Sequence, residues 1–133
     1  MVDHPDHPLA REVPAKLAVA YVEAGQPARA ATEYERVAGQ EGESAEVRRA
    51  ALWQAAELHA AAGDRAAATR VYAAYVERFP APVAAAIDAR QALADLARDS
   101  GDAAARSRWL GEVVAADRTA GADRTDRTKF LAA

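Results

Sequence analysis

Few residues of this chain have side chains suited to catalysis or metal binding. The 133 residues include three histidines and no cysteine, so there is no thiol nucleophile and no thiolate metal ligand. His4 and His7 alternate with Asp3 and Asp6 in the motif DHPDHP, and imidazole and carboxylate groups bind metals. Their position in a proline-containing terminus favours a solvated tail over a metal site. We predict no metal and no cofactor.

The carboxylates offer little more for acid–base chemistry. Asp95 and Asp99 have the i, i+4 spacing of one helix face, and Glu57 stands at a comparable place earlier in the chain. Paired carboxylates can transfer protons, but no nucleophile or metal ligand accompanies them, so a solvated acidic face is the better interpretation. The motif GQEGES at residues 39–44 lacks the spacing and the lysine of a phosphate-binding loop. We therefore predict that the protein is not an enzyme.

Composition indicates an all-α protein. Hydrophobic residues make up 51% of the chain while aromatic residues make up 6%, and much of the hydrophobic share is alanine, the strongest helix former. A net charge of -3 gives no broad basic surface, which argues against nucleic acid as a partner. No apolar run approaches the roughly 18 residues of a membrane span.

A glycine-containing turn motif recurs along the chain. GQPARAATEYERV begins at Gly25, GDRAAATRVYAAY at Gly63 and GDAAARSRWLGEV at Gly101, so the three glycines are evenly spaced. Glycine suits the left-handed residue that ends many helices. Asp64 and Asp102 follow as expected N-caps. The pattern predicts three helical hairpins of one constant period.

The expected organisation follows from this period. We predict a flexible tail over residues 1–10, repeats over about 11–44, 49–82 and 87–118, and the start of a seventh helix in 119–133, after Gly121. This last segment is interpreted as part of a truncated repeat of a longer protein. One hairpin cannot cover its own apolar face, so the hairpins should stack around a continuous core.

These residues resemble the tetratricopeptide repeat (TPR) family. The slots of the second repeat hold Leu52, Ala55, Ala56, His59, Ala68, Tyr72 and Pro80, and those of the first hold Pro14, Leu17, Ala18, Tyr21, Ala30 and Tyr34. The third repeat is degenerate, and the period is longer than the roughly 34 residues usual in the family. The resemblance implies a right-handed superhelix of antiparallel hairpins that binds a protein or peptide without catalysis.

The ending Tyr72, Tyr75, Phe79, Pro80 resembles bacterial cell-envelope TPR proteins, including the coordinator of the Tol–Pal system. This likeness implies a periplasmic or envelope location. The cytoplasm is the alternative, because the absence of cysteine fits both compartments.

In the TPR family the first helix of each hairpin lines a concave groove. Carried over to this sequence, the groove candidates are Lys16, Val19, Glu23, Trp53, Gln54, Glu57, Asp88, Gln91, Asp95 and Arg98. Lys16 and Arg98 are the two cations of this set and the chain has no asparagine, so the Lys/Asn clamp for a terminal carboxylate is excluded. The acidic lining suits a peptide with basic and apolar residues. Trp53 has two open interpretations, an apolar anchor for that peptide or packing between helices.

Self-association is the alternative function. Trp109 lies on the last complete helix, where a following repeat would normally cover it, and Phe130 and Leu131 are expected to face inward from the next helix. Terminal repeats need a polar cap. An apolar end formed by Trp109, Phe130 and Leu131 would therefore pair with another copy.

Overall fold

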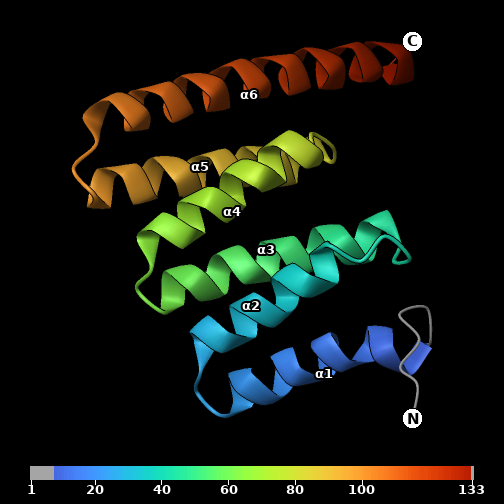
Figure 1. Cartoon of the computed structure of the whole chain (residues 1–133). Coiled ribbons are helices and arrows are strands. Elements are labelled where there is room, and N and C mark those ends of the chain that lie inside the picture. Colours follow the sequence, from blue (N-terminus) through green and yellow to red (C-terminus); the bar gives the residue numbers. More distant parts are fainter. Residues whose placement is uncertain (1–7, 133) are drawn as a thin grey trace. The chain divides into compact units, whose positions relative to one another are not determined.

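The computed structural model describes residues 8–132 of the chain and the side chains of residues 13–119. This described part is all-α, as predicted, and holds six helices and no strand. They are α1 (Pro8–Glu23), α2 (Pro27–Ala38), α3 (Ala45–Ala61), α4 (Arg65–Arg78), α5 (Val83–Asp99) and α6 (Ala103–Ala132) (Figure 1). None of these helices combines the length and the apolarity needed to cross a membrane.

Glycine ends the first helix of each hairpin, as the sequence predicted. Gly25, Gly63 and Gly101 have φ values of 71°, 81° and 77°, in the region that glycine adopts without a Cβ clash. At the first turn the amide of Gln26 donates to the carbonyl of Tyr21 at 2.8 Å, which closes the helix end. The left-handed residue turns the chain back and starts the second helix of the hairpin.

Two of the second helices begin with the predicted N-caps. Asp64 Oδ1 accepts a hydrogen bond of 3.0 Å from the amide of Ala67 at the start of α4. Asp102 Oδ1 does the same for Ala105 at the start of α6, also at 3.0 Å. Pro27 occupies the first turn of α2, where its missing N–H leaves no bond unmade. Local capping and proline thus mark where the second helix of each hairpin begins.

The chain forms two compact units, Met1–Tyr75 and Val76–Ala133. In the first unit, α2 packs against both α1 and α3. Small residues make this packing close, because Ala18, Ala30, Ala31, Ala55, Ala56 and Ala68 all have 0% exposure. Larger side chains, Leu52, Val71 and Tyr75, fill the space left between the helices. Full burial of one such aliphatic side chain contributes about 1.5–3 kcal/mol.

In the second unit α5 packs on α6. Leu93 is 1% exposed and lies with Ala86, Ala89 and Ala94 in the buried face of α5, while Trp109 of α6 is 8% exposed. Nε of Arg90 lies 3.4 Å from Oε1 of Glu112, which joins the two helices at the edge of this core.

Two predicted boundaries were wrong. The first helix begins at Pro8, inside the expected tail of residues 1–10, because proline is well tolerated in the first turn of a helix. No seventh helix begins after Gly121, since α6 continues without a break from Ala103 to Ala132. A glycine inside a helix costs only about 1 kcal/mol relative to alanine, and no proline follows Gly121 to stop the helix.

Candidate functional site

The exposed stripe of α3 is the candidate binding surface of the first unit. Ala51, Leu52, Ala55, Ala56 and His59 are the buried residues of α3. The opposite side of the helix carries Ala50, Gln54, Glu57 and Ala61, which recur at helical spacing and are exposed. The predicted groove residues Gln54 and Glu57 therefore lie in one solvent-facing row.

Trp53 borders this stripe and packs on α4. Its ring meets Tyr72 at 5.4 Å with an interplanar angle of 81° and Tyr75 at 5.2 Å with an angle of 71°. These edge-to-face pairs each contribute about 0.5–1.5 kcal/mol beyond area burial. They are the contacts expected if Trp53 packs between helices. The ring is half-buried, so part of it still borders the stripe.

The two tyrosines are held firmly beneath Trp53. Tyr75 is 1% exposed, and its hydroxyl accepts a hydrogen bond of 3.2 Å from Nη1 of Arg49. Burial, together with the nearby charge of Glu57, raises the pKa of Tyr72 to about 12. Tyr72 is therefore neutral at any physiological pH, and Glu57 contributes a negative charge close to the aromatic cluster.

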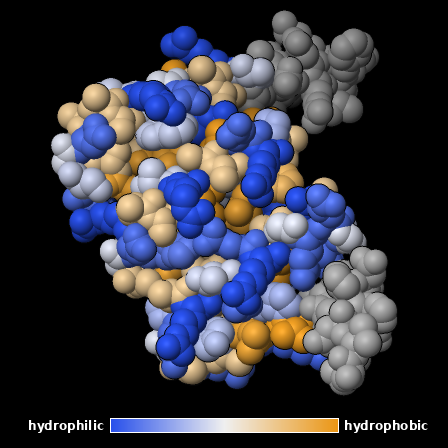
Figure 2. Space-filling view, in the orientation of Figure 1, coloured by the Kyte–Doolittle hydropathy of each residue, from blue (hydrophilic) through white to orange (hydrophobic). Residues whose placement is uncertain are grey.

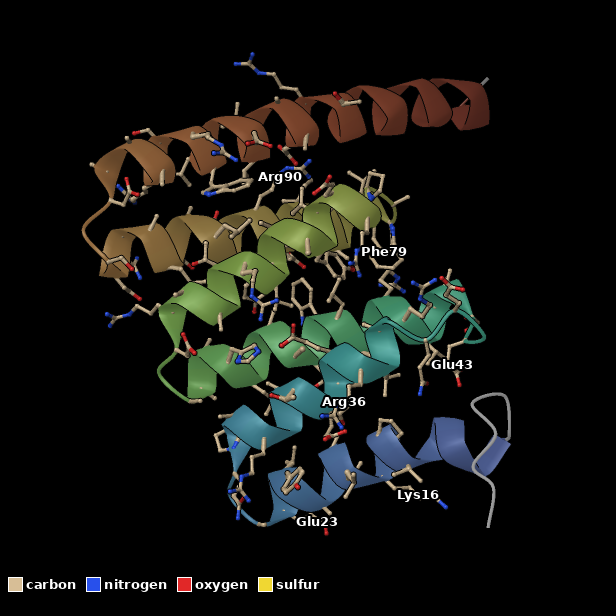
Figure 3. The ribbon with its side chains drawn as sticks, in the orientation of Figure 1. Lys16, Glu23, Arg36, Glu43, Phe79 and Arg90 are labelled. Atoms are coloured by element: carbon tan, nitrogen blue, oxygen red, sulfur yellow. The ribbon has the colours of Figure 1, made fainter. Side chains whose placement is uncertain are left out.

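The groove candidates of α1 are all exposed. Lys16 and Glu23 point away from α2 in Figure 3, and Val19 is 50% exposed. Like the α3 stripe, these residues belong to the first unit. They precede Gln54, Glu57 and Ala61 by one repeat period, the spacing of Gly25 and Gly63. The two helices therefore present corresponding positions to solvent.

The groove candidates of α5 belong to the second unit, and three of them, Gln91, Asp95 and Arg98, contact one another. Asp88, Gln91 and Arg98 are exposed and Asp95 is half-buried. Gln91 Nε2 donates to Asp95 Oδ1 at 3.2 Å, and the Arg98 guanidinium lies 3.9 Å from Asp95 and 3.3 Å from Asp99. The predicted Asp95–Asp99 pair is thus partly neutralised on its own helix.

A partly buried polar cluster in the first unit was missed by sequence reasoning. Glu35 on α2 lies 2.7 Å from Nε2 of His59 on α3 and receives hydrogen bonds of 2.8 and 3.3 Å from Arg70 on α4. Because a carboxylate only accepts, Nε2 of His59 carries the donated proton. Nδ1 of His59 is buried without a hydrogen bond among the described residues.

Opposing effects act on the pKa of Glu35. Burial raises this pKa, but the hydrogen bonds and charges of Arg70 and His59 outweigh burial and hold it below its ordinary value of 4.5. The carboxylate is therefore ionised and paired. His59 is buried between helices at the repeat slot that the sequence assigned to it, and Glu35 is the partner that the sequence did not reveal. The 24 and 35 residues separating Glu35 from His59 and Arg70 left no local signal.

The described residues contain no group of three or more His, Cys, Asp or Glu able to hold a metal ion. His4 and His7, with Asp3 and Asp6, lie outside the described residues.

The expected apolar end at the third hairpin takes a different form. Trp109 is buried, at 8% exposure, and the Arg108 guanidinium lies 4.4 Å from the centre of its ring. The expectation that this ring is uncovered was wrong, because packing of α6 on α5 encloses it. The side chains of Phe130 and Leu131 lie outside those that the structure describes.

Comparison with known families selects two segments, residues 16–44 and 50–81. Both match the tetratricopeptide repeat. The first TPR match takes in the second half of α1 and all of α2, and the second takes in most of α3 and all of α4. Together the matches cover a little under half of the chain, and the third hairpin, interpreted as degenerate, lies outside them. No curated protein and no solved structure is significantly similar to this chain.

Proposed function

We propose that this chain is a non-catalytic protein-binding module whose α3 stripe takes a peptide segment with basic and apolar residues. TPR repeats generally mediate protein–protein interactions through surfaces that successive hairpins build together. The observation that carries the proposal is the exposed row of Gln54 and Glu57 beside the half-buried ring of Trp53. Glu57 supplies a negative charge, and the edge of Trp53 supplies an apolar contact.

Charge supports a basic partner over an acidic one. Glu57 is exposed and also acts on Tyr72, while Gln54 can donate and accept hydrogen bonds. Positions 50 and 61 of the row are exposed alanines, whose small side chains let a peptide backbone approach the helix. The net charge of -3 also attracts a positively charged ligand at longer range.

A peptide array tests this proposal. Twelve-residue peptides with one Leu or Phe flanked by Lys or Arg are compared with charge-reversed peptides that keep the apolar residue. The chain should select the basic set, and Glu57→Lys should weaken binding at least about fivefold, as reversal of one close charge pair does. The matched control is Glu41→Lys, a reversal at an exposed residue of the α2–α3 loop. Equal effects of the two variants would reject the α3 stripe as the binding surface.

The envelope location is a proposal that rests on the resemblance of the Tyr72–Pro80 ending. Fractionation of the native cell, with the chain detected by antibody, tests it. Recovery with the cytoplasmic fraction alone would reject it.

Self-association through the C-terminal end is the alternative. Burial of Trp109 removes one of the three side chains on which it depended. We therefore place the binding function first.

A further inference from the structure

The exposed surface of α1 is unusually apolar for a surface helix, with Val13 and Leu17 on one flank and Val19 and Val22 on the other. Val13, Leu17, Val19 and Val22 are 50%, 37%, 50% and 46% exposed, and they are four of the seven large hydrophobic side chains found exposed among the described residues. From Val13 to Ala24 the charged residues are Lys16 and Glu23 alone. A helix that is apolar almost all round normally lies in an interior. Figure 2 shows hydrophobic surface gathered over α1.

The internal repeat identifies the part of α1 that stays exposed among the residues whose side chains the structure describes. Ala51 and Ala55 of α3 follow Val13 and Leu17 by one repeat period, and they are 4% and 0% exposed. Helix α3 has α2 packed on it and meets α4 through Trp53. Helix α1 buries Ala18 toward α2, and its flank at Val13 and Leu17 is open. The corresponding flank of the next repeat shows that this position accepts a helix.

Side-chain size along this flank favours an antiparallel helix of the same sequence. The flank runs Val13, Leu17, Ala20, Ala24, with large residues in the first half and small ones in the second. Two antiparallel copies set Leu17 against Ala20 and Val13 against Ala24 of the other copy, so large meets small. A parallel pair would set Leu17 against Leu17 and leave a gap at the alanines.

The charged residues of α1 also favour the antiparallel arrangement. Lys16 and Glu23 are two helical turns apart and both point away from α2 (Figure 3). The antiparallel arrangement that pairs Leu17 with Ala20 also sets Lys16 close to Glu23 of the other copy, twice by symmetry. A parallel pair would place Lys16 and Glu23 of the two copies on opposite edges of the interface, where they could not pair. We propose that α1 is a self-association surface on which a second copy of this chain binds through its own α1, antiparallel and with two-fold symmetry.

The interface is small, so the association is weak. One side of a single helix buries less surface than the roughly 1,200 Å² of a stable complex. A dimer is expected to form at high micromolar concentrations. This inference goes beyond the proposed function, because it concerns α1 and needs no foreign peptide. If the peptide array shows no binding, the self-association proposal is unaffected. If the chain stays monomeric, the peptide-binding proposal is unaffected.

Sedimentation velocity of the full chain, from about 5 µM to about 1 mM, tests the proposal. The wild-type chain should show a concentration-dependent shift from monomer to dimer. Leu17→Glu should weaken the dimer at least about tenfold, because it buries a carboxylate against an apolar face. Lys16→Glu alone and Glu23→Lys alone should each weaken it at least about fivefold, and the double variant Lys16→Glu/Glu23→Lys should restore it.

The double variant identifies the occupant. If α1 instead bound α6 of another copy, Val114→Glu, at an exposed position of α6, would abolish association and the double swap would not rescue it. That result would overturn the proposal, as would a monomer at every concentration. Circular dichroism and urea unfolding of each variant check the fold. The charge variants concern exposed side chains, so they keep the test decisive even if Leu17→Glu fails to fold.

Discussion

Glu35 of α2 accepts a hydrogen bond of 2.7 Å from Nε2 of His59 on α3, and this bond joins the first TPR match to the second. Arg70 of α4 holds the other oxygen of the same carboxylate at 2.8 Å. One side chain therefore connects three helices. In a stack of repeats each hairpin is stabilised by contacts with its neighbour, and the bonds of Glu35 are polar contacts of this kind.

Removal of the Glu35 carboxylate should destabilise the first unit. Glu35→Ala leaves the buried His59 Nε2 without an acceptor, and an unsatisfied buried group costs about 1–3 kcal/mol. Urea unfolding followed by circular dichroism measures the loss. Glu41→Ala, at an exposed loop residue, is the control and should change stability by less than about 0.5 kcal/mol. Equal losses in both variants would contradict the structural role of the cluster.

The same cluster predicts a pH dependence. The pKa of Glu35 in the folded chain lies below 4.5, so the unfolded chain binds the proton more readily than the folded chain. The contribution of Glu35 to stability is therefore complete above the unfolded pKa, near 4.5, and is lost as the pH falls through the lower folded value. Urea midpoints between pH 3 and pH 7 measure this change. Glu35→Gln should lose part of the acid-side decrease, and an unchanged decrease would contradict the assignment.

Trp53 should couple energetically to Tyr75. The two rings make an edge-to-face contact at 5.2 Å, which predicts an interaction energy of about 0.5–1.5 kcal/mol in a double-mutant cycle. The single variants Trp53→Leu and Tyr75→Leu and the double variant are compared by urea unfolding. A coupling energy near zero would show that the aromatic contact adds nothing to area burial. A second cycle, which combines Trp53→Leu with Glu41→Ala at the exposed loop residue, serves as the control.

Two glycines of the second unit should respond in opposite ways to the same substitution. Gly101 has a φ of 77°, and an added Cβ would meet no other atom within 4 Å, so Gly101→Ala should cost about 1–2 kcal/mol through backbone strain alone. Gly111 lies inside α6, and its Cβ would also meet open space. Gly111→Ala should therefore stabilise the chain by about 0.5–1 kcal/mol. Thermal unfolding measures both changes, and a destabilising Gly111→Ala would contradict the open environment of that residue.

The sequence by itself determined the helices, the hairpin turns and the TPR pattern. Gly25, Gly63 and Gly101 end helices through their own backbone dihedral angles. Asp64 and Asp102 cap helices by accepting a hydrogen bond from the amide three residues further along the chain. Such signals act between neighbours in the chain and can be recognised from residue type and spacing. The burial of Ala18 and Ala56 followed from the repeat, because they occupy the same slot of successive hairpins and are both 0% exposed.

Tertiary structure decided which distant side chains meet. Glu35 contacts His59 and Arg70 because α2 packs on the next hairpin with each helix turned about its axis to one particular angle. The spacing of residues does not specify that angle for partners 24 and 35 residues apart. The same packing placed Trp53 against Tyr72 and Tyr75 and enclosed Trp109. It also left Val13 and Leu17 open on α1, because exposure depends on which helix is a neighbour and residue type does not record this.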